Sequence, residues 1–135
     1  QVEETPVYQR HDVLPAPVMA ALSGKAPKWK SLGFGVKQSI IHSDKSGSVR
    51  LLHIPAGEAV PEHGHEGIEM TLVLQGAFHD ETGYFGVGDV EVADDSLDHQ
   101  PIAAEGQPCI CLAATGAPLK FHSWVTRLFQ PIFRI

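Results

Sequence analysis

Cysteine is scarce in this sequence, and it has neither a long apolar run nor a basic cluster. Its two cysteines, Cys109 and Cys111, lie too close together to cross-link a secreted scaffold, so we expect a reducing, cytoplasmic setting. No apolar run reaches the roughly 18 to 20 residues of a membrane helix, and residues 1–4 are too polar for a secretory signal. The net charge of −6, with lysine and arginine scattered, disfavours nucleic-acid binding.

The size and composition of the chain fit one folded domain. Its 135 residues are 43% hydrophobic and 19% charged, which is typical of a globular protein. Residues 1–13 are polar and aperiodic, and we interpret them as a linker or N-terminal arm. We expect residues 14–135 to form the domain. Because the sequence starts at Gln1, we expect it to be a trimmed chain or part of a longer one.

Short strands separated by turn residues dominate the pattern. Residues 14–22 predict a short helical turn, and β-rich segments follow from about residue 35. The predicted strands are 36–42, 48–54, 69–74, 77–80, 84–87, 89–92, 98–102, 108–114 and 119–123. Many short strands at regular spacing indicate an all-β sandwich or barrel.

The segment 57–69 carries the most informative chemistry. In an extended chain His63, His65 and Glu69 share one face, so two imidazoles and a carboxylate converge. These donors suit zinc, iron, manganese, nickel or copper, and His99, beyond a later turn, is the candidate fourth ligand. The alternative is a hydrogen-bonded polar cluster without a metal, which is harder to satisfy in a barrel.

The spacing of these residues resembles the first motif of the cupin superfamily. The matching positions are Gly57, His63, His65, Glu69 and Gly76. The stretch from Gly83 to His99 resembles the second motif, except that Gly86 replaces a usual proline and no asparagine follows the histidine. This resemblance implies a single cupin-type double-stranded β-helix, or jelly-roll barrel.

A closer resemblance is to the C-terminal cupin domain of ChrR-type anti-sigma factors. It is carried by residues 72–78, 80–83, 109–115 and 127–131. It implies that His63, His65, Glu69 and His99 bind zinc. It also implies a regulatory domain that controls an extracytoplasmic-function sigma factor in response to singlet oxygen or related oxidants. The family's N-terminal domain has a histidine followed by a cysteine pair, which these residues lack, so sigma binding would need a domain absent from this chain.

Two other functions remain open on the residues alone. Three histidines and a glutamate also suit a dioxygenase or isomerase that uses iron or manganese. No further acid and base pair stands out near the motif, so we expect a regulatory domain more than an enzyme. A plain binding domain for a small anion or a sugar is the third interpretation, supported only by the cavity that such barrels have.

Several other side chains have two interpretations. Cys109 and Cys111 share one face and are either small buried hydrophobes or an oxidant target. His53 is expected to be packed and hydrogen-bonded, or to line the cavity. Trp29 and Trp124 are expected to be packing anchors rather than a pair that stacks on a ligand.

The strand predicted at residues 69–74 is apolar on both faces. Met70, Leu72 and Leu74 lie opposite Glu69, Thr71 and Val73. The outer face therefore needs a cover. We expect residues 124–135 to supply it, or a second subunit, which would make the protein a homodimer.

Overall fold

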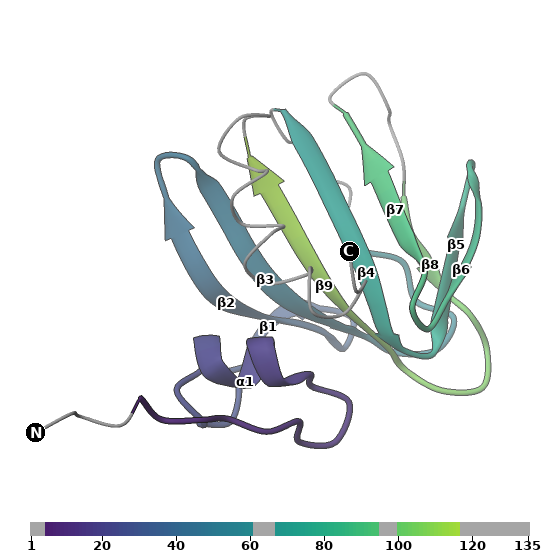
Figure 1. Cartoon of the computed structure of the whole chain (residues 1–135). Helices are drawn as coiled ribbons and strands as arrows, with labels where there is room; N and C mark the ends of the chain where they lie inside the picture. The colour runs from purple at the N-terminus through teal and green to yellow at the C-terminus, as the bar shows by residue number, and fades with distance from the viewer. Residues whose placement is uncertain (1–4, 61–66, 95–99, 117–135) are drawn as a thin grey trace, which may run out of the picture.

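The computed structural model describes residues 5–60, 67–94 and 100–116. Within these ranges the chain forms one short helix and nine strands (Figure 1). In chain order they are α1 (Ala16–Ala21), β1 (Lys30–Gly33), β2 (Val36–Asp44), β3 (Gly47–Ile54), β4 (Ile68–Gln75), β5 (Ala77–Asp80), β6 (Gly83–Gly86), β7 (Val90–Ala93), β8 (Ile102–Ala103) and β9 (Cys109–Gly116). The predicted all-β class is confirmed.

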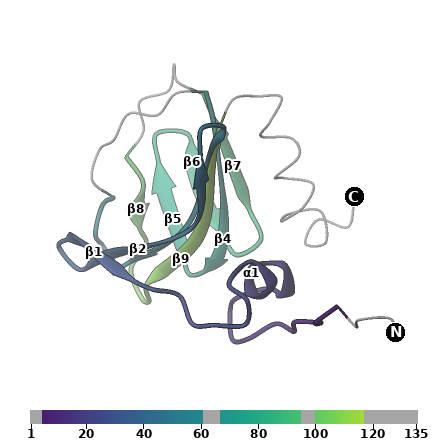
Figure 2. The same cartoon turned by 90° about the vertical axis from the view of Figure 1, so that its left-hand side faces the viewer.

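The strands form two antiparallel sheets. The larger has the order β1-β2-β3-β9-β4-β7, and the smaller has the order β6-β5-β8. Figure 2 shows α1 against the larger sheet, on the side away from the smaller one. In the larger sheet β9 pairs with both β3 and β4, so a late strand lies between two earlier ones.

The hairpin between β2 and β3 forms where the small polar residues 43–47 predict a turn. The Asp44 carboxylate accepts hydrogen bonds from the backbone and the hydroxyl of Ser46 and from the His42 ring, and these bonds lower its pKa to about 2. Gly47 follows with a φ of 145°. A Cβ atom there would collide with the Thr115 carbonyl oxygen, so only glycine lets β3 approach β9 this closely.

An apolar cluster fills the space between the sheets. Its buried members are Val36, Ile54, Val60, Val73, Phe78, Ala103, Cys109 and Cys111. The Phe78 and Phe85 rings stack within the smaller sheet with centroids 5.0 Å apart. This face of the larger sheet is therefore the interior of the fold.

A second apolar cluster lies on the outer face of the larger sheet. Leu14, Val18 and Met19 pack there, and Val18 is completely buried. They cover Val49, Leu51, Leu72, Leu74, Leu112 and Ala114. The prediction that this face needs a cover is correct, but α1 and Leu14 supply it over this area. Residues 124–135, to which the cover was assigned, lie outside the described residues.

Some strand limits differ from the sequence prediction. Strand β1 was missed, because all four of its residues are exposed and show no apolar alternation. Residues 98–102 were predicted as one strand, yet the described part contains only β8, which begins at Ile102. The strand predicted at 119–123 lies outside the described residues. In the described part of the chain no helix is long and apolar enough to cross a membrane.

Substitution of Leu112 by alanine tests the outer cluster. Leu112 is fully buried beneath α1, so its truncation is expected to lower the free energy of unfolding by about 2 to 5 kcal/mol. The matched control is Leu32→Ala, at a position 39% exposed, where a change below about 0.5 kcal/mol is expected. Chemical denaturation measures both, and equal effects would contradict this packing.

Candidate metal centre

Glu69 lies near the start of β4 and faces the interior. It is opposite Thr115 of β9 on one side and Ala93 of β7 on the other. Its side chain is buried, with 6% exposure, and the Thr71 hydroxyl donates to its Oε1 atom across 3.5 Å. Val73 on the same face belongs to the interior cluster, and Leu72 and Leu74 belong to the outer one. The predicted alternation along this strand is therefore correct.

The other three predicted ligands, His63, His65 and His99, lie outside the described residues. In the part of the chain that the structure describes, no group of three histidine, cysteine, aspartate or glutamate side chains is placed to hold a metal. The four-ligand site therefore stays a prediction. Its donor set, three imidazoles and one carboxylate, fits a zinc ion, and Glu69 is the donor whose position is described.

The described residues that flank these histidines lie close together. The Val60 amide donates to the Pro101 carbonyl at 3.0 Å, and the Gln100 side-chain amide donates to the Val60 carbonyl at 3.4 Å. At their other ends, the two undescribed segments meet neighbouring strands, because Glu69 pairs with Ala93. The described residues that flank segments 61–66 and 95–99 are therefore neighbours on both sides.

The interior face of the larger sheet is arranged in rows across its strands. The first row contains Ser48, Thr115, Glu69 and Ala93, and the second contains Arg50, Ala113, Thr71 and Glu91. The third contains Leu52, Cys111 and Val73, and the fourth contains Ile54 and Cys109. The interior is therefore polar at the end that carries Glu69 and apolar at the other.

A chain of hydrogen bonds crosses the polar end. The Arg50 guanidinium donates from Nη1 to Gln38 Oε1 at 3.0 Å and from Nη2 to Ser48 Oγ at 2.9 Å. The Ser48 and Thr115 hydroxyl oxygens are 3.0 Å apart. Since Ser48 accepts from Arg50, its own hydrogen can go to Thr115. The sequence analysis missed Arg50, although its alternation with Leu52 and Ile54 places it on the interior face.

Glu91 links the two sheets at this end. It faces the interior from β7 with 4% exposure, and the Thr82 hydroxyl lies 2.6 Å from its Oε2 atom. Thr82 lies in the turn between β5 and β6, in the smaller sheet. Sequence reasoning missed this residue as well, because a single glutamate in a short strand carries no distinctive spacing.

The two cysteines occupy the apolar end. Cys109 and Cys111 share the interior face, as predicted, and both are free thiols with exposures of 0% and 1%. A hydrogen bond between the thiols, burial, and the Cys109 and Glu69 charges raise the pKa of Cys111 well above its usual range. The same hydrogen bond lowers the pKa of Cys109.

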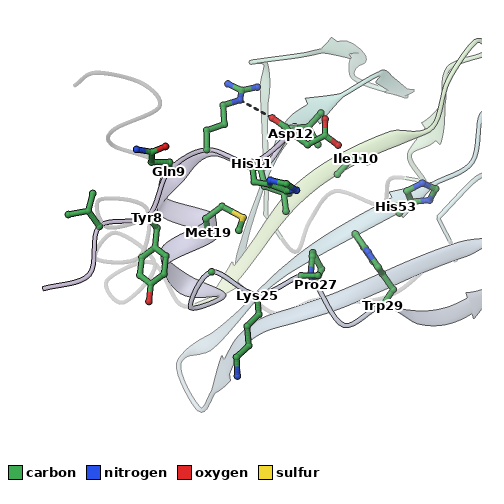
Figure 3. A pocket seen from close by; sticks show the side chains of 16 residues that line it. Tyr8, Gln9, His11, Asp12, Met19, Lys25, Pro27, Trp29, His53 and Ile110 are labelled. Carbon is green, nitrogen blue, oxygen red and sulfur yellow. Dashed lines mark hydrogen bonds between the residues drawn. The ribbon is translucent and has the colours of Figure 1, made fainter.

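A cavity of about 680 Å³ lies on the outer face, and Figure 3 shows the side chains that line it. The segment around His11, the loop before Trp29, and His53 line it. The rings of Trp29 and His53 meet edge to face with centroids 6.0 Å apart, so His53 is packed as expected. Its Nδ1 atom is buried and has no hydrogen-bond partner in the described part of the chain. His53 therefore faces outward, away from the barrel interior.

The burial of the thiols predicts slow labelling by a thiol reagent. In the native protein Cys109 and Cys111 are expected to react at least about 100-fold more slowly than in denaturant, because reaction requires local opening and an ionised thiol. A Ser43→Cys variant, at an exposed position of the hairpin, provides a matched reactive control. If Cys109 and Cys111 in the native protein reacted as fast as the cysteine at position 43 of the control, their interior placement would be contradicted.

Comparison with known proteins identifies close relatives of this domain. A family model described as the ChrR cupin-like domain matches residues 19–118. Over 108 residues the chain is 57% identical to the anti-sigma-E factor ChrR of Cereibacter sphaeroides. That match covers 80% of this chain and 51% of the relative, so the chain spans about half of the relative's length.

Solved structures agree on the fold. One match is to the crystal structure of Rhodobacter sphaeroides SigE in complex with the anti-sigma factor ChrR, with 51% identity and a TM-score of 0.70. This match covers 76% of this chain and 58% of the chain in that structure. An RmlC-like cupin from Ralstonia eutropha is 23% identical, with a TM-score of 0.59, covering 67% and 64%. These matches confirm the jelly-roll architecture of the cupin fold. The chain therefore belongs to the family of ChrR cupin-like domains.

Proposed function

We propose that this domain is the zinc-binding regulatory part of an anti-sigma factor that responds to singlet oxygen or related oxidants. Its similarity to ChrR, one representative of which was solved in complex with SigE, supports a sigma factor as the regulated partner. The chain covers about half of its relative, and we assign contact with the sigma factor to the N-terminal domain that the family resemblance implies. The observation that carries the proposal is the 57% identity to an anti-sigma factor.

The arrangement around Glu69 supports a zinc site. Its carboxylate is buried on the interior face, and the segments that contain His63, His65 and His99 start and end at neighbouring positions. Zinc would supply a cross-link between these segments, which stabilises the folded state by the free energy of binding. In this site Glu69 would provide the oxygen ligand, and the three histidines would provide nitrogen ligands.

The strands that form the interior site also form the outer packing surface. Thr71 and Val73 face inward from β4. On the opposite face of the same strand, Leu72 and Leu74 belong to the outer apolar cluster that includes Val18 and Met19 of α1. A change in the position of Glu69 therefore acts on the strand that supports α1. Through this packing, loss of a metal ligand would loosen α1 and the N-terminal segment before it.

Substitution of the proposed ligands tests the metal site. His99→Ala and Glu69→Gln are each expected to lower bound zinc from about one equivalent to well below half, and to lower Tm by several degrees. His79→Ala removes an exposed histidine and is the matched control, with zinc content and Tm unchanged. Metal analysis and thermal unfolding measure both quantities. Full zinc content in either ligand variant would reject that residue as a ligand.

Metal removal tests the link between the interior and α1. The Met19 backbone amide in α1 donates to the Pro15 carbonyl, and the Leu22 backbone amide just after α1 donates to the Val18 carbonyl, both at 3.0 Å. Treatment with a chelator is expected to speed hydrogen exchange at these amides and in β4 by about 10-fold or more, because local opening costs less free energy. Amides in the β2–β3 hairpin serve as an internal reference. Loss of zinc with unchanged exchange in α1 would contradict the proposed coupling.

A further inference from the structure

The cavity on the outer face begins where the packing of α1 on the larger sheet ends. Leu51 of β3 and Leu112 of β9 are partners in the outer apolar cluster, and the next outward pair along these strands is His53 with Ile110. Both members of that pair line the cavity and form its floor. The volume of about 680 Å³ falls in the range of sites that bind small organic molecules.

The lining of this cavity differs in polarity between its rim and its deeper part. Among the described residues that line it, the charged ones are Arg10, Asp12 and Lys25, and all three are exposed. Figure 3 shows the Lys25 ammonium pointing away from Trp29. The buried and half-buried part of the lining includes Leu14, Met19, Pro27, His53 and Ile110. The deeper part is therefore apolar, with one imidazole.

His53 offers a hydrogen bond that the described residues do not use. Its Nδ1 atom is buried without a partner, and its ring makes no other hydrogen bond within the described part of the chain. Hydrogen on Nε2 is the tautomer that avoids an unpartnered buried N–H group at Nδ1. The ring lines the cavity while its Nδ1 edge is buried, so the opposite edge, which carries Nε2, is available to a ligand. A ligand at this floor thus meets a hydrogen-bond donor.

We propose that the outer cavity binds an uncharged, flat aromatic molecule that carries one oxygen acceptor, of the phenol or aryl ketone class. The Trp29 ring is 37% exposed and offers an aromatic surface, and Met19 and Ile110 offer apolar contacts. The ligand oxygen accepts from Nε2 of His53. A charged group at this depth would lose its hydration without gaining an ion partner among the described residues. This site goes beyond the proposed function and does not depend on the metal.

The N-terminal segment forms a wall that such a ligand would stabilise. His11 and Leu14 exchange two backbone hydrogen bonds, each of 3.0 Å, which hold the segment beside α1. Tyr8 lies so close to Gly24 that a Cβ atom on Gly24 would be 3.0 Å from Tyr8 Cε1. His11, Leu14 and Tyr8 also line the cavity. A ligand in contact with both the floor and this wall therefore makes local opening of the segment less favourable.

Calorimetric titration of the full chain with 2-naphthol tests the site. This compound has two flat rings and one hydroxyl, and one equivalent is expected to bind with saturation. Methylnaphthalene, with a methyl group in the same position, is expected to bind about 3- to 10-fold more weakly, because it cannot accept a hydrogen bond from His53. Naphthoate is expected to bind at least about 10-fold more weakly than naphthol, because its carboxylate is charged.

Matched substitutions test the roles of His53 and Trp29. His53→Phe keeps a ring without nitrogen, so naphthol is expected to bind about 3- to 10-fold more weakly and to lose its advantage over methylnaphthalene. His79→Phe changes an exposed histidine of β5 and is the control, with both affinities unchanged. Trp29→Ala is expected to weaken both compounds by about 10-fold. Thermal unfolding checks that each variant folds, and Trp29→Leu, with a smaller loss for both compounds, replaces Trp29→Ala if that variant does not.

Hydrogen exchange tests whether the N-terminal segment takes part in the site. At a naphthol concentration of about ten times Kd, exchange at the His11 and Leu14 amides is expected to slow by about 10-fold, because opening must release the ligand. Amides of the β2–β3 hairpin serve as the internal reference. Unchanged exchange at His11 and Leu14 while naphthol is bound would overturn the assignment of this segment as a wall.

The titrations can also overturn the site itself. Absence of saturable naphthol binding would reject it. Tighter binding of naphthoate than of naphthol would reject an uncharged ligand and would assign the binding energy to the exposed cations. An equal loss of naphthol affinity in His53→Phe and His79→Phe would reject the hydrogen bond to His53. None of these results bears on zinc content, so the metal site is tested separately.

Discussion

The pairing of β9 with both β3 and β4 is the constraint on which the rest of this domain depends. It places Thr115 between Ser48 and Glu69, and Cys111 between Leu52 and Val73. Because side chains alternate between the faces of a strand, a one-residue slip would exchange the interior and outer residues of β9. The position of Glu69, the thiol pair and the packing of α1 would change together. Gly47 protects this register, because its lack of a side chain permits close contact at the end of β9.

The interior formed by this register is divided by polarity. Rows that contain Cys109, Cys111 and Val73 are apolar, and here the energy of folding comes from burial of hydrophobic surface. Rows that contain Arg50 and Glu69 carry charges that such packing alone does not satisfy. Polar groups in a barrel interior are stable when they are hydrogen-bonded, paired or bound to a ligand. The polar end is thus the part of the fold where a bound ligand would contribute to stability.

Period-two alternation made much of this arrangement predictable. It correctly indicated seven strands, β2 to β7 and β9, together with the inward face of Glu69 and the common face of Cys109 and Cys111. Strand β1 was not predicted, because its exposed residues show no apolar periodicity. It is held by its pairing with β2. The packing of α1 on the outer face was not predicted, because packing between distant segments leaves no local sequence pattern. Arg50 was overlooked because its importance depends on cross-strand neighbours, which a register reveals and a single sequence does not.

The two faces of β4 and β9 explain how a site inside a barrel can influence a surface outside it. Leu72 and Leu112 lie under Val18, whereas Thr71 and Ala113 occupy the row beside Glu69. Close-packed interiors tolerate little volume change, so a shift of these strands moves residues on both faces. Under the proposed function, an oxidant that altered a metal ligand inside the barrel would act on α1 through these strands. Such coupling requires that the strands move together, and the pairing of β9 with both β3 and β4 favours this.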